Sequence, residues 1–506
     1  MKRIIGAILA LTLLLGCIPA ALAQEAEPVH VIMLDPYYGD ASSEKGYQMV
    51  HDYILEQTGV DVTSYRFTSS DKSEKTNRML GATDMKVNTW CSNWTTYVGF
   101  DMIQPINDYM DLIPSVQEKW APYNAMSTVM DPNGNVWGVP RISSRAFYQS
   151  FLRQDWLDQL NLAYPTTFED FEKCLYAIKD ADPYGNGETI PLIIRNNMTT
   201  MEYHFLAGFT KYGRSNWLDD DGLLKPYYLQ EGYYDFLEKM NQWYADGIIH
   251  AENITWNTAT IRNYLASGRV AGSAAYTTDV SAQYINTKVN YPTAVWYYPQ
   301  DGLVGPNGNM CETLIAANDE CTLFNKKNTD EEMRACLKVI EWGYSDWTNN
   351  KVLTSGIQGV HWEYDTSYEN CYTNHITKTL DVDPSIVYRG DFWYTIGIAN
   401  EGDCIQYDPD GQQNFHNYML RHQKDFYTCT LPFDLGVIYN NSELYENVIS
   451  ANDIETMVSR EIFDFFKGEK QLTRENWQAF INDLYDNGLQ EYIEEYTRQY
   501  KAWNNL

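Results

Sequence analysis

The chain has 506 residues, 44% hydrophobic and 21% charged, so it is long enough for roughly two to four globular domains with full cores. Its formal net charge of −31 argues against nucleic-acid binding, which needs a basic surface, and against attraction to anionic lipid. The 40 tyrosines and 15 tryptophans fit carbohydrate recognition, because flat rings pack on sugar C–H faces. The alternative for any single ring is a place in the core.

The first residues have the pattern of a secretory signal peptide. A basic start precedes the apolar run Ile4–Leu15, which is too short for a stable membrane span. Ala21–Ala23 before Gln24 is an A-x-A cleavage site, and Leu14–Cys17 resembles a lipobox that would leave Cys17 lipid-modified. The first site is favoured because no Gly/Ser tether follows Cys17. Both alternatives predict an exported protein, either free or anchored at the cell surface.

An α/β pattern follows the leader. Val29–Leu34 is apolar and predicts a strand, Ser43–Thr58 has helical periodicity ended by Gly59, and Val60–Phe67 predicts the next strand. A further strand is predicted at Met85–Val87. Ligands gather outside the carboxyl ends of such strands, so three residues that follow them are candidates for a sugar-facing rim: Tyr37, Trp90 and Asn93. The alternative is that the rings cap the sheet.

The stretch 131–195 predicts a turn, a strand, a helix, a loop and a strand. Asp131–Gly134 is a hairpin turn signal, and an extended run covers 147–152. Thr166 or Thr167 is the expected N-cap of a helix whose buried face is Phe168, Phe171, Leu175 and Ile178. Ile190 begins the second strand. This order predicts a crossover between parallel strands.

The loop after this helix spaces its oxygen-bearing side chains like a calcium loop. The possible ligands are Asp180, Asp182, Asn186 and Glu188. Tyr184 stands where an oxygen ligand is needed, which counts against a metal. The alternative is a turn that ends the helix.

Helical patterns dominate the rest of the chain. Helices are predicted at 201–209, 232–244, 260–267, 331–347, 453–467, 474–487 and 489–503, with a strand at 270–276. Tyr276 just beyond this strand, and Trp296, are candidates for a cleft. In Gly356–Tyr364 two glycines allow a tight turn, and Trp362 offers a stacking ring. The alternative is a rigid turn with Trp362 packed inside and His361 structural.

Eight cysteines follow Cys17, and their spacing does not match a metal-binding motif. Cys174 is expected to be a plain buried thiol. Pairing cannot be determined from spacing, and Cys311–Cys321 is one candidate.

Four motifs, in order, carry a family resemblance. They are GNVWGVP at 134–140, RQDWLDQL at 153–160, PTTFEDF at 165–171 and DADPYGNGETIPL at 180–192. NRML at 77–80, the 356–364 stretch and GEKQL at 468–472 agree with them. The chain resembles the family 1 extracellular solute-binding proteins, the sugar-capturing components of ABC importers, and in particular their large lipoprotein-like Firmicutes branch.

The resemblance implies an α/β, periplasmic-binding-protein-like type II clamp with discontinuous lobes and a helical C-terminus. One lobe would comprise 24–140 with 276–320, and the other 141–275 with 321–506. A carbohydrate, an oligosaccharide, would bind between them and pass to the permease subunits of the importer, with the protein a monomer. The expected ligand contacts are Tyr37, Trp90, Asn93, Arg141, Tyr276, Trp296 and Trp362. Arg141 could bond hydroxyls or a uronate, or form an inter-lobe salt bridge.

Two other classes compete with this interpretation. A secreted glycan hydrolase would need a carboxylate pair, which 68 acidic residues can supply by chance. The sequence has no G-x-S-x-G, H-E-x-x-H, P-loop or Rossmann motif, so no enzymatic activity is expected. A surface glycan-binding scaffold would want repeats or anchor segments, and the sequence contains neither.

Overall fold

The computed structural model describes residues 27–35, 41–66, 72–82, 85–91, 94–121, 125–140, 148–194, 198–276, 287–288, 290–297, 299, 302–311, 321–364, 377–392 and 441–506. The leader and its two cleavage sites lie outside these ranges. Within them, no helix has the length and apolar character needed to cross a bilayer.

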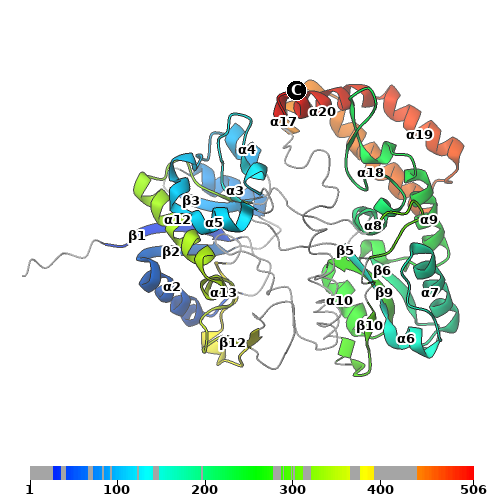
Figure 1. Ribbon diagram of the computed structural model, residues 1–506, viewed down its shortest axis with the longest axis horizontal. Coiled ribbons are helices and arrows are strands. Elements are labelled where there is room, and N and C mark those ends of the chain that lie inside the picture. Colours follow the sequence, from blue (N-terminus) through cyan, green and yellow to red (C-terminus); the bar gives the residue numbers. More distant parts are fainter. Residues whose placement is uncertain are drawn as a thin grey trace, which may run out of the picture.

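The first sheet has five strands in the order β2-β1-β3-β11-β4. β1 is parallel to β2 and β3, and β11 is antiparallel to both β3 and β4. Helices surround this sheet (Figure 1). The strands are β1 (Val29–Asp35), β2 (Val60–Arg66), β3 (Val87–Cys91), β4 (Val139–Pro140) and β11 (Cys321–Leu323). The helices are α2 (Glu44–Thr58), α3 (Lys72–Gly81), α4 (Trp94–Gly99), α5 (Pro114–Trp120), α12 (Asp330–Ser345) and α13 (Trp347–Ser355).

The predicted boundaries of α2 are confirmed, and both are set by local chemistry. The Ser43 hydroxyl accepts a hydrogen bond from the Gly46 amide, which satisfies a backbone donor at the helix start. Gly59 ends the helix with φ of 69°, a conformation that costs glycine little. By contrast, β3 begins at Val87, where the predicted strand ended, so Trp90 lies within the strand and not beyond it.

The second sheet has four strands in the order β10-β5-β9-β6. They are β5 (Tyr148–Arg153), β6 (Ile190–Ile194), β9 (Val270–Tyr276) and β10 (Trp296–Tyr297). β9 lies between β5 and β6, antiparallel to β5 and parallel to β6. The predicted crossover between parallel strands is therefore wrong, because β5 and β6 run in opposite directions and the later strand β9 separates them.

Helix α7 (Phe168–Ala181) starts where its sequence predicts. Thr167 is the N-cap, and its hydroxyl accepts from the Asp170 amide at 3.1 Å. Phe168, Phe171 and Leu175 are at most 3% exposed, as the helical periodicity requires of the face that covers the sheet.

The remaining elements complete the second core and the C-terminal region. The helices are α6 (Gln154–Gln159), α8 (Met198–Phe205), α9 (Tyr233–Ala245), α10 (Thr258–Ala266), α17 (Asn441–Asn447), α18 (Ala451–Lys467), α19 (Arg474–Asp486) and α20 (Leu489–Trp503). Two short hairpins pair β7 (Trp217–Leu218) with β8 (Leu224–Lys225), and β12 (Trp362–Tyr364) with β13 (Thr377–Thr379). Single-turn 3₁₀ helices include η6 (Tyr227–Leu229) and η8 (Pro384–Ile386).

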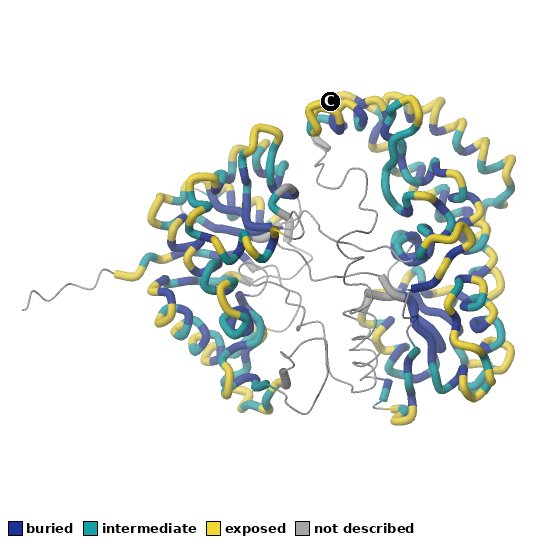
Figure 2. The backbone as a smooth tube through the Cα atoms, in the orientation of Figure 1, coloured by how far each residue is buried: buried dark blue, intermediate teal, exposed yellow. Residues whose placement is uncertain are grey.

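Buried residues form separate cores around the two sheets, as the dark segments in Figure 2 show. The first body comprises described residues of 27–140 and 321–392, and the second comprises those of 148–311 and 441–506. Two placements differ from the predicted lobes of 24–140 with 276–320 and 141–275 with 321–506. Trp296 pairs in the second sheet and Cys321 pairs in the first. The division of the whole chain into lobes stays a prediction.

The cysteine predictions have mixed outcomes. Cys174 is 4% exposed and free, so the predicted plain buried thiol is confirmed, and burial raises the pKa of this thiol to about 11. Cys311 lies in the second core and Cys321 in the first. The proposed bond between them is therefore wrong.

The last helix reaches across to the first body. Trp503, near the end of α20, packs against the first core, with its ring 6.3 Å from that of Trp94 in α4. Trp94 is 2% exposed, and its indole N–H donates to the Thr128 carbonyl at 3.0 Å. The two bodies are therefore joined by side-chain packing as well as by the chain.

Candidate functional site

The carboxyl ends of parallel strands lie together at one edge of each sheet. In the first sheet these are the ends of β1, β2, β3 and β4. In the second, β6 and β9 end at the edge where antiparallel β5 begins. The chain passes from Pro140 at the first edge to Tyr148 at the second, and eight residues span at most about 29 Å. The two edges are therefore neighbours, at the position where α/β proteins gather ligands.

Five predicted ligand contacts map to these edges. Tyr37 follows β1, Asn93 follows β3 and Arg141 follows β4, and all three lie outside the described residues. Trp90 and Tyr276 are placed by their backbone, in β3 and at the end of β9. Topology thus brings these positions to the same two edges, and their contact with a ligand stays a prediction.

Trp296 does not face a ligand site. Its side chain is 1% exposed, and its ring packs edge-on against Phe151 at 5.0 Å. Arg153, whose guanidinium carbon is 5.9 Å from the Trp296 ring centre, lies beside it. Because β10 pairs with β5, this face of the strand points into the core. The predicted ligand contact at Trp296 is wrong in this structure.

Trp362 is also a core residue. It is 1% exposed, its indole N–H donates to the Gly356 carbonyl at 2.6 Å, and it meets Trp347 edge-on at 5.9 Å. His361 accepts from the Ile357 amide at 2.9 Å, and burial lowers its pKa. The alternative of a rigid turn is correct here, and the predicted ligand contact at Trp362 is wrong.

Gly356 is needed for this turn. Its φ is 91°, and a Cβ at this position would meet the His361 ring at 2.6 Å. The glycine therefore allows close packing within the turn and not the approach of a ligand.

The loop after α7 turns its oxygens toward its own backbone. Asp182 has left-handed φ of 44°, and its carboxylate accepts from the amides of Gly187 at 2.6 Å and Thr189 at 3.1 Å. Hydrogen bonding to Thr189 and Gly187 lowers the Asp182 pKa. Glu188 lies 3.5 Å from the Arg269 guanidinium. These bonds make a helix-ending turn.

The predicted calcium ligands are therefore not assembled into a site. Over the described ranges, no three His, Cys, Asp or Glu side chains come together as metal ligands. The loop residues Asp180, Asp182, Asn186 and Glu188 are all among those described, and the carboxylates of Asp182 and Glu188 contact groups of the chain itself.

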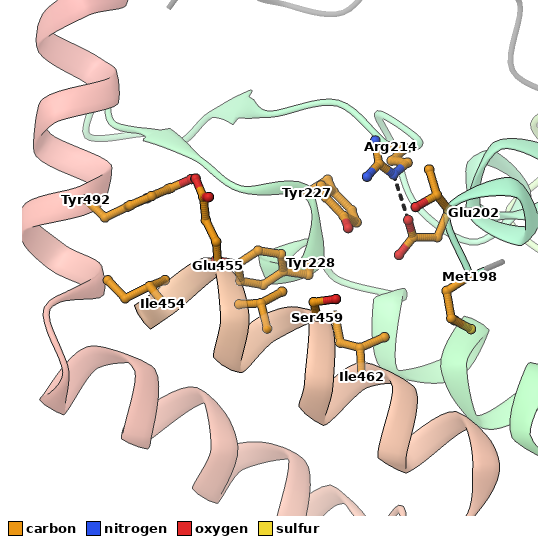
Figure 3. A pocket seen from close by; sticks show the side chains of 12 residues that line it. Met198, Glu202, Arg214, Tyr227, Tyr228, Ile454, Glu455, Ser459, Ile462 and Tyr492 are labelled. Atoms are coloured by element: carbon orange, nitrogen blue, oxygen red, sulfur yellow. Dashed lines mark hydrogen bonds and ion pairs between the residues drawn. The ribbon is translucent and has the colours of Figure 1, made fainter. Parts of the chain in front are cut away.

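A pocket of about 280 Å³ opens in the second body (Figure 3). Its walls come from the start of α8, from η6, and from α18 and α20 of the C-terminal region. α8 begins at Met198, shortly after β6 ends at Ile194, so this wall adjoins the ligand-gathering edge of the second sheet. The lining residues are Met198, Thr199, Glu202, Arg214, Tyr227, Tyr228, Ile454, Glu455, Val458, Ser459, Ile462 and Tyr492.

A partly buried ion pair organises one side of the pocket. The Arg214 Nε donates to Glu202 at 2.7 Å, and the Glu202 side chain is 3% exposed. The second Glu202 oxygen accepts from the Tyr233 hydroxyl at 2.7 Å, and Arg214 also lies over the Tyr227 ring. These contacts hold both charged groups in one geometry.

Tyrosines supply the other polar atoms of the pocket. Burial raises the pKa of Tyr227, Tyr228 and Tyr492, so their phenols keep their protons at neutral pH. The Tyr492 hydroxyl donates to Glu455 at 3.0 Å. The pocket therefore combines aromatic faces with fixed hydrogen-bonding groups.

Part of the chain is similar in sequence to known proteins. No protein-family model matches the chain. The fructooligosaccharide ABC transporter substrate-binding protein FusA of Streptococcus pneumoniae is 26% identical over 226 residues, 40% of this chain and 39% of FusA. Lipoprotein LipO of Bacillus subtilis is 27% identical over 247 residues, 46% of this chain and 47% of LipO. The chain thus matches less than half the length of these relatives.

Solved structures match nearly the whole fold. The alginate-binding protein AlgQ2 superposes with a TM-score of 0.67 at 17% identity, over 94% of this chain and 98% of AlgQ2. FusA in complex with kestose superposes with a TM-score of 0.64 at 16% identity, over 94% of this chain and 99% of FusA. The chain is thus similar to ABC-transporter substrate-binding proteins in part of its sequence, and to solved solute-binding proteins in nearly all of its fold. The predicted family resemblance and α/β fold class are confirmed.

The sequence alone did not predict the pocket beside α8. Ser459 is far along the chain from Glu202 and Arg214, and only tertiary packing brings α18 to them. The available signal was the pair Tyr227-Tyr228 after Pro226, which indicates an aromatic turn. That signal alone does not distinguish a pocket from a packed turn.

Proposed function

We propose that this chain is the substrate-binding protein of an ABC importer, which captures an oligosaccharide between its two bodies and delivers it to a membrane permease. The observation that carries the proposal is that one protein, FusA, is similar to the chain both in sequence and in nearly full-length structure. FusA is named for fructooligosaccharides and has been solved with kestose. Another relative is named a polygalacturonan/rhamnogalacturonan-binding protein.

Binding would involve groups from both sheet edges. Tyr37, Trp90, Asn93 and Arg141 would act from the first body, and Tyr276 from the second. Ligand that contacts both bodies favours the closed arrangement, because only that arrangement allows all the contacts at once. Such a protein stabilises its ligand in the ground state, so it needs no group that lowers a reaction barrier.

Export would bring the protein to its ligand. The proposed leader at 1–23 would release a free protein after Ala23, or cleavage before Cys17 would leave it lipid-anchored. Mass spectrometry of the mature N-terminus separates the two forms.

The test is a thermal-shift and calorimetric screen of residues 24–506 against neutral and acidic oligosaccharides. A saccharide at 100 times its Kd should stabilise the protein by about 2.7 kcal/mol. Saturable binding without release of reducing ends after long incubation agrees with the proposal. Release of reducing ends would instead indicate a glycan hydrolase, and the absence of any saccharide binding would reject the importer function.

Alanine at Trp90 tests the proposed contacts. Loss of a stacking ring should weaken binding by about 1 kcal/mol or more, roughly fivefold. Affinity within twofold of the unsubstituted protein, with the fold intact, would remove Trp90 from the site.

A further inference from the structure

We propose that the pocket between α8, η6, α18 and α20 binds one neutral sugar ring, as the end or branch unit of a captured oligosaccharide. This inference rests on the proposed function and adds a site and a ligand class to it. It depends on the position, lining, charge and rigidity of the pocket.

The pocket lies where a ligand bound at the carboxyl edge of the second sheet can also enter it. Met198 and Thr199 line the pocket at the start of α8, directly beyond the carboxyl end of β6. β9 ends at the same sheet edge as β6. An oligosaccharide lying along that edge can therefore extend a terminal unit toward the pocket.

The lining suits a sugar ring in both its apolar and polar parts. Tyr227 and Tyr228 contribute aromatic surface, and Ile454 and Ile462 add an apolar wall (Figure 3). Val458 belongs to the same wall. Sugar C–H faces pack on such rings, while hydroxyls bond the charged pair and the phenols. Small-molecule pockets usually measure about 300–1,000 Å³. The 280 Å³ found here therefore suits one ring better than several.

The charge of the lining favours a neutral unit over a uronate. Glu202 and Glu455 are the carboxylates of the lining, and Arg214 is its cation. Arg214 is already paired with Glu202 at 2.7 Å, and Glu455 accepts from the hydroxyls of Tyr445 and Tyr492, both at 3.0 Å. An added carboxylate would thus face a net negative lining whose one arginine is committed to another partner.

The pocket is built before any ligand arrives. Glu202 bridges Arg214 and the hydroxyl of Tyr233, whose side chain is 0% exposed in the second core. Since these groups are already fixed, binding needs little ordering of side chains.

The experiment blocks the pocket from an exposed position. Ser459 lies on α18 at the pocket and is exposed, so Ser459→Phe places a ring there without disturbing the core. Thr456→Phe adds the same ring to an exposed site on α18 that does not line the pocket, and serves as the matched control. Ser459→Leu is a smaller block from the same position should phenylalanine perturb the helix, which circular dichroism and Tm would reveal.

Calorimetry compares inulin-type fructooligosaccharides and galacturonate oligomers, each two to five units long. In the unsubstituted protein and in Thr456→Phe, we expect the affinity for the neutral oligosaccharides to rise at least tenfold with length. In Ser459→Phe, we expect this rise to be absent. For the galacturonate oligomers, we expect Ser459→Phe to leave the dependence of affinity on length unchanged.

Three results would overturn the proposal. One is an unchanged length dependence in Ser459→Phe, as expected if a segment of the chain itself occupies the pocket. Another is that the affinity for galacturonate oligomers, and not that for the neutral series, rises with length and loses this rise in Ser459→Phe. The third is that no saccharide binds the unsubstituted protein, which rejects the importer function as well. If the unsubstituted protein binds a saccharide and Ser459→Phe has no effect, the proposed subsite is wrong while the proposed importer function stands.

Discussion

Individual side chains in this protein owe their roles to what surrounds them, as its tryptophans show. Trp296 and Trp362 have the chemistry of sugar-stacking rings, yet each is 1% exposed and packed by aromatic neighbours. Glu202 and Arg214 have no distinctive pattern in the sequence, yet they form the partly buried ion pair of a pocket. At this scale, burial and partners decide function more than residue type does.

Trp362→Ala should lower stability and leave affinity unchanged. Removing a buried Trp leaves a cavity, and the expected loss is about 3–5 kcal/mol in the free energy of unfolding. Urea denaturation measures this loss, and calorimetry on the folded variant should give a saccharide Kd within twofold of the unsubstituted protein. A stable variant with much weaker binding would restore Trp362 to the ligand site.

Glu202→Ala should destabilise the second body by about 3 kcal/mol. The substitution leaves the Arg214 charge and the Tyr233 hydroxyl without their shared carboxylate. Glu494→Ala, at an exposed position on α20, is the control and should change stability by no more than about 0.5 kcal/mol. Equal urea midpoints for the two variants would show that the pair contributes nothing.

Elements in this fold are bounded by local signals and tied together by a few polar contacts. Polar contacts of α20 are an example. Arg498 donates to both oxygens of Glu495, at 2.8 Å and 2.6 Å, and it also bonds Glu443 of α17. Gln499 donates to Glu495 at 2.8 Å. Arg498 thus links α20 to α17, while the Glu495 carboxylate holds its guanidinium in place.

The Glu495 carboxylate should make stability depend on pH in the acid range. Hydrogen bonds from Arg498 lower its pKa to about 2, below the unfolded value of about 4.3. Its stabilisation is therefore complete above pH of about 4.3 and is lost as pH falls toward 2.

Glu495→Gln tests this dependence. It should cost about 2 kcal/mol at pH 7 and flatten the loss of stability between pH of about 4 and 2. Urea midpoints measured across that range check the outcome, with the exposed Glu494→Gln as control. Parallel pH profiles for Glu495→Gln and the unsubstituted protein would contradict it.

The described residues form two bodies, which are joined by chain passages and by an aromatic contact. The chain leaves the first body after Pro140, returns to it after Cys311 and leaves again after Phe392. Trp503 of α20 packs on Trp94 of the first body, so the C-terminal helix bridges the two. Interfaces of this kind permit relative motion of the bodies.

Ligand should close the two bodies measurably. Small-angle scattering is expected to give a smaller radius of gyration with the saccharide identified by thermal shift than with a non-binding one. Trp503→Ala, which removes the bridging ring, should change the radius of the free protein more than that of the bound protein. Identical scattering curves with and without bound saccharide would reject the clamp.

The sequence by itself determined the α/β class, the family resemblance and several helix boundaries. Ser43, Gly59 and Thr167 act within a few residues of their own position, so caps and helix faces can be predicted without the rest of the chain. Only the tertiary structure decided which sheet received Trp296 and Cys321, which way β5 and β6 run, and that Glu202 meets α18 at a pocket. Those outcomes depend on strand pairing and helix packing between distant segments, and such partners leave no local pattern in the sequence.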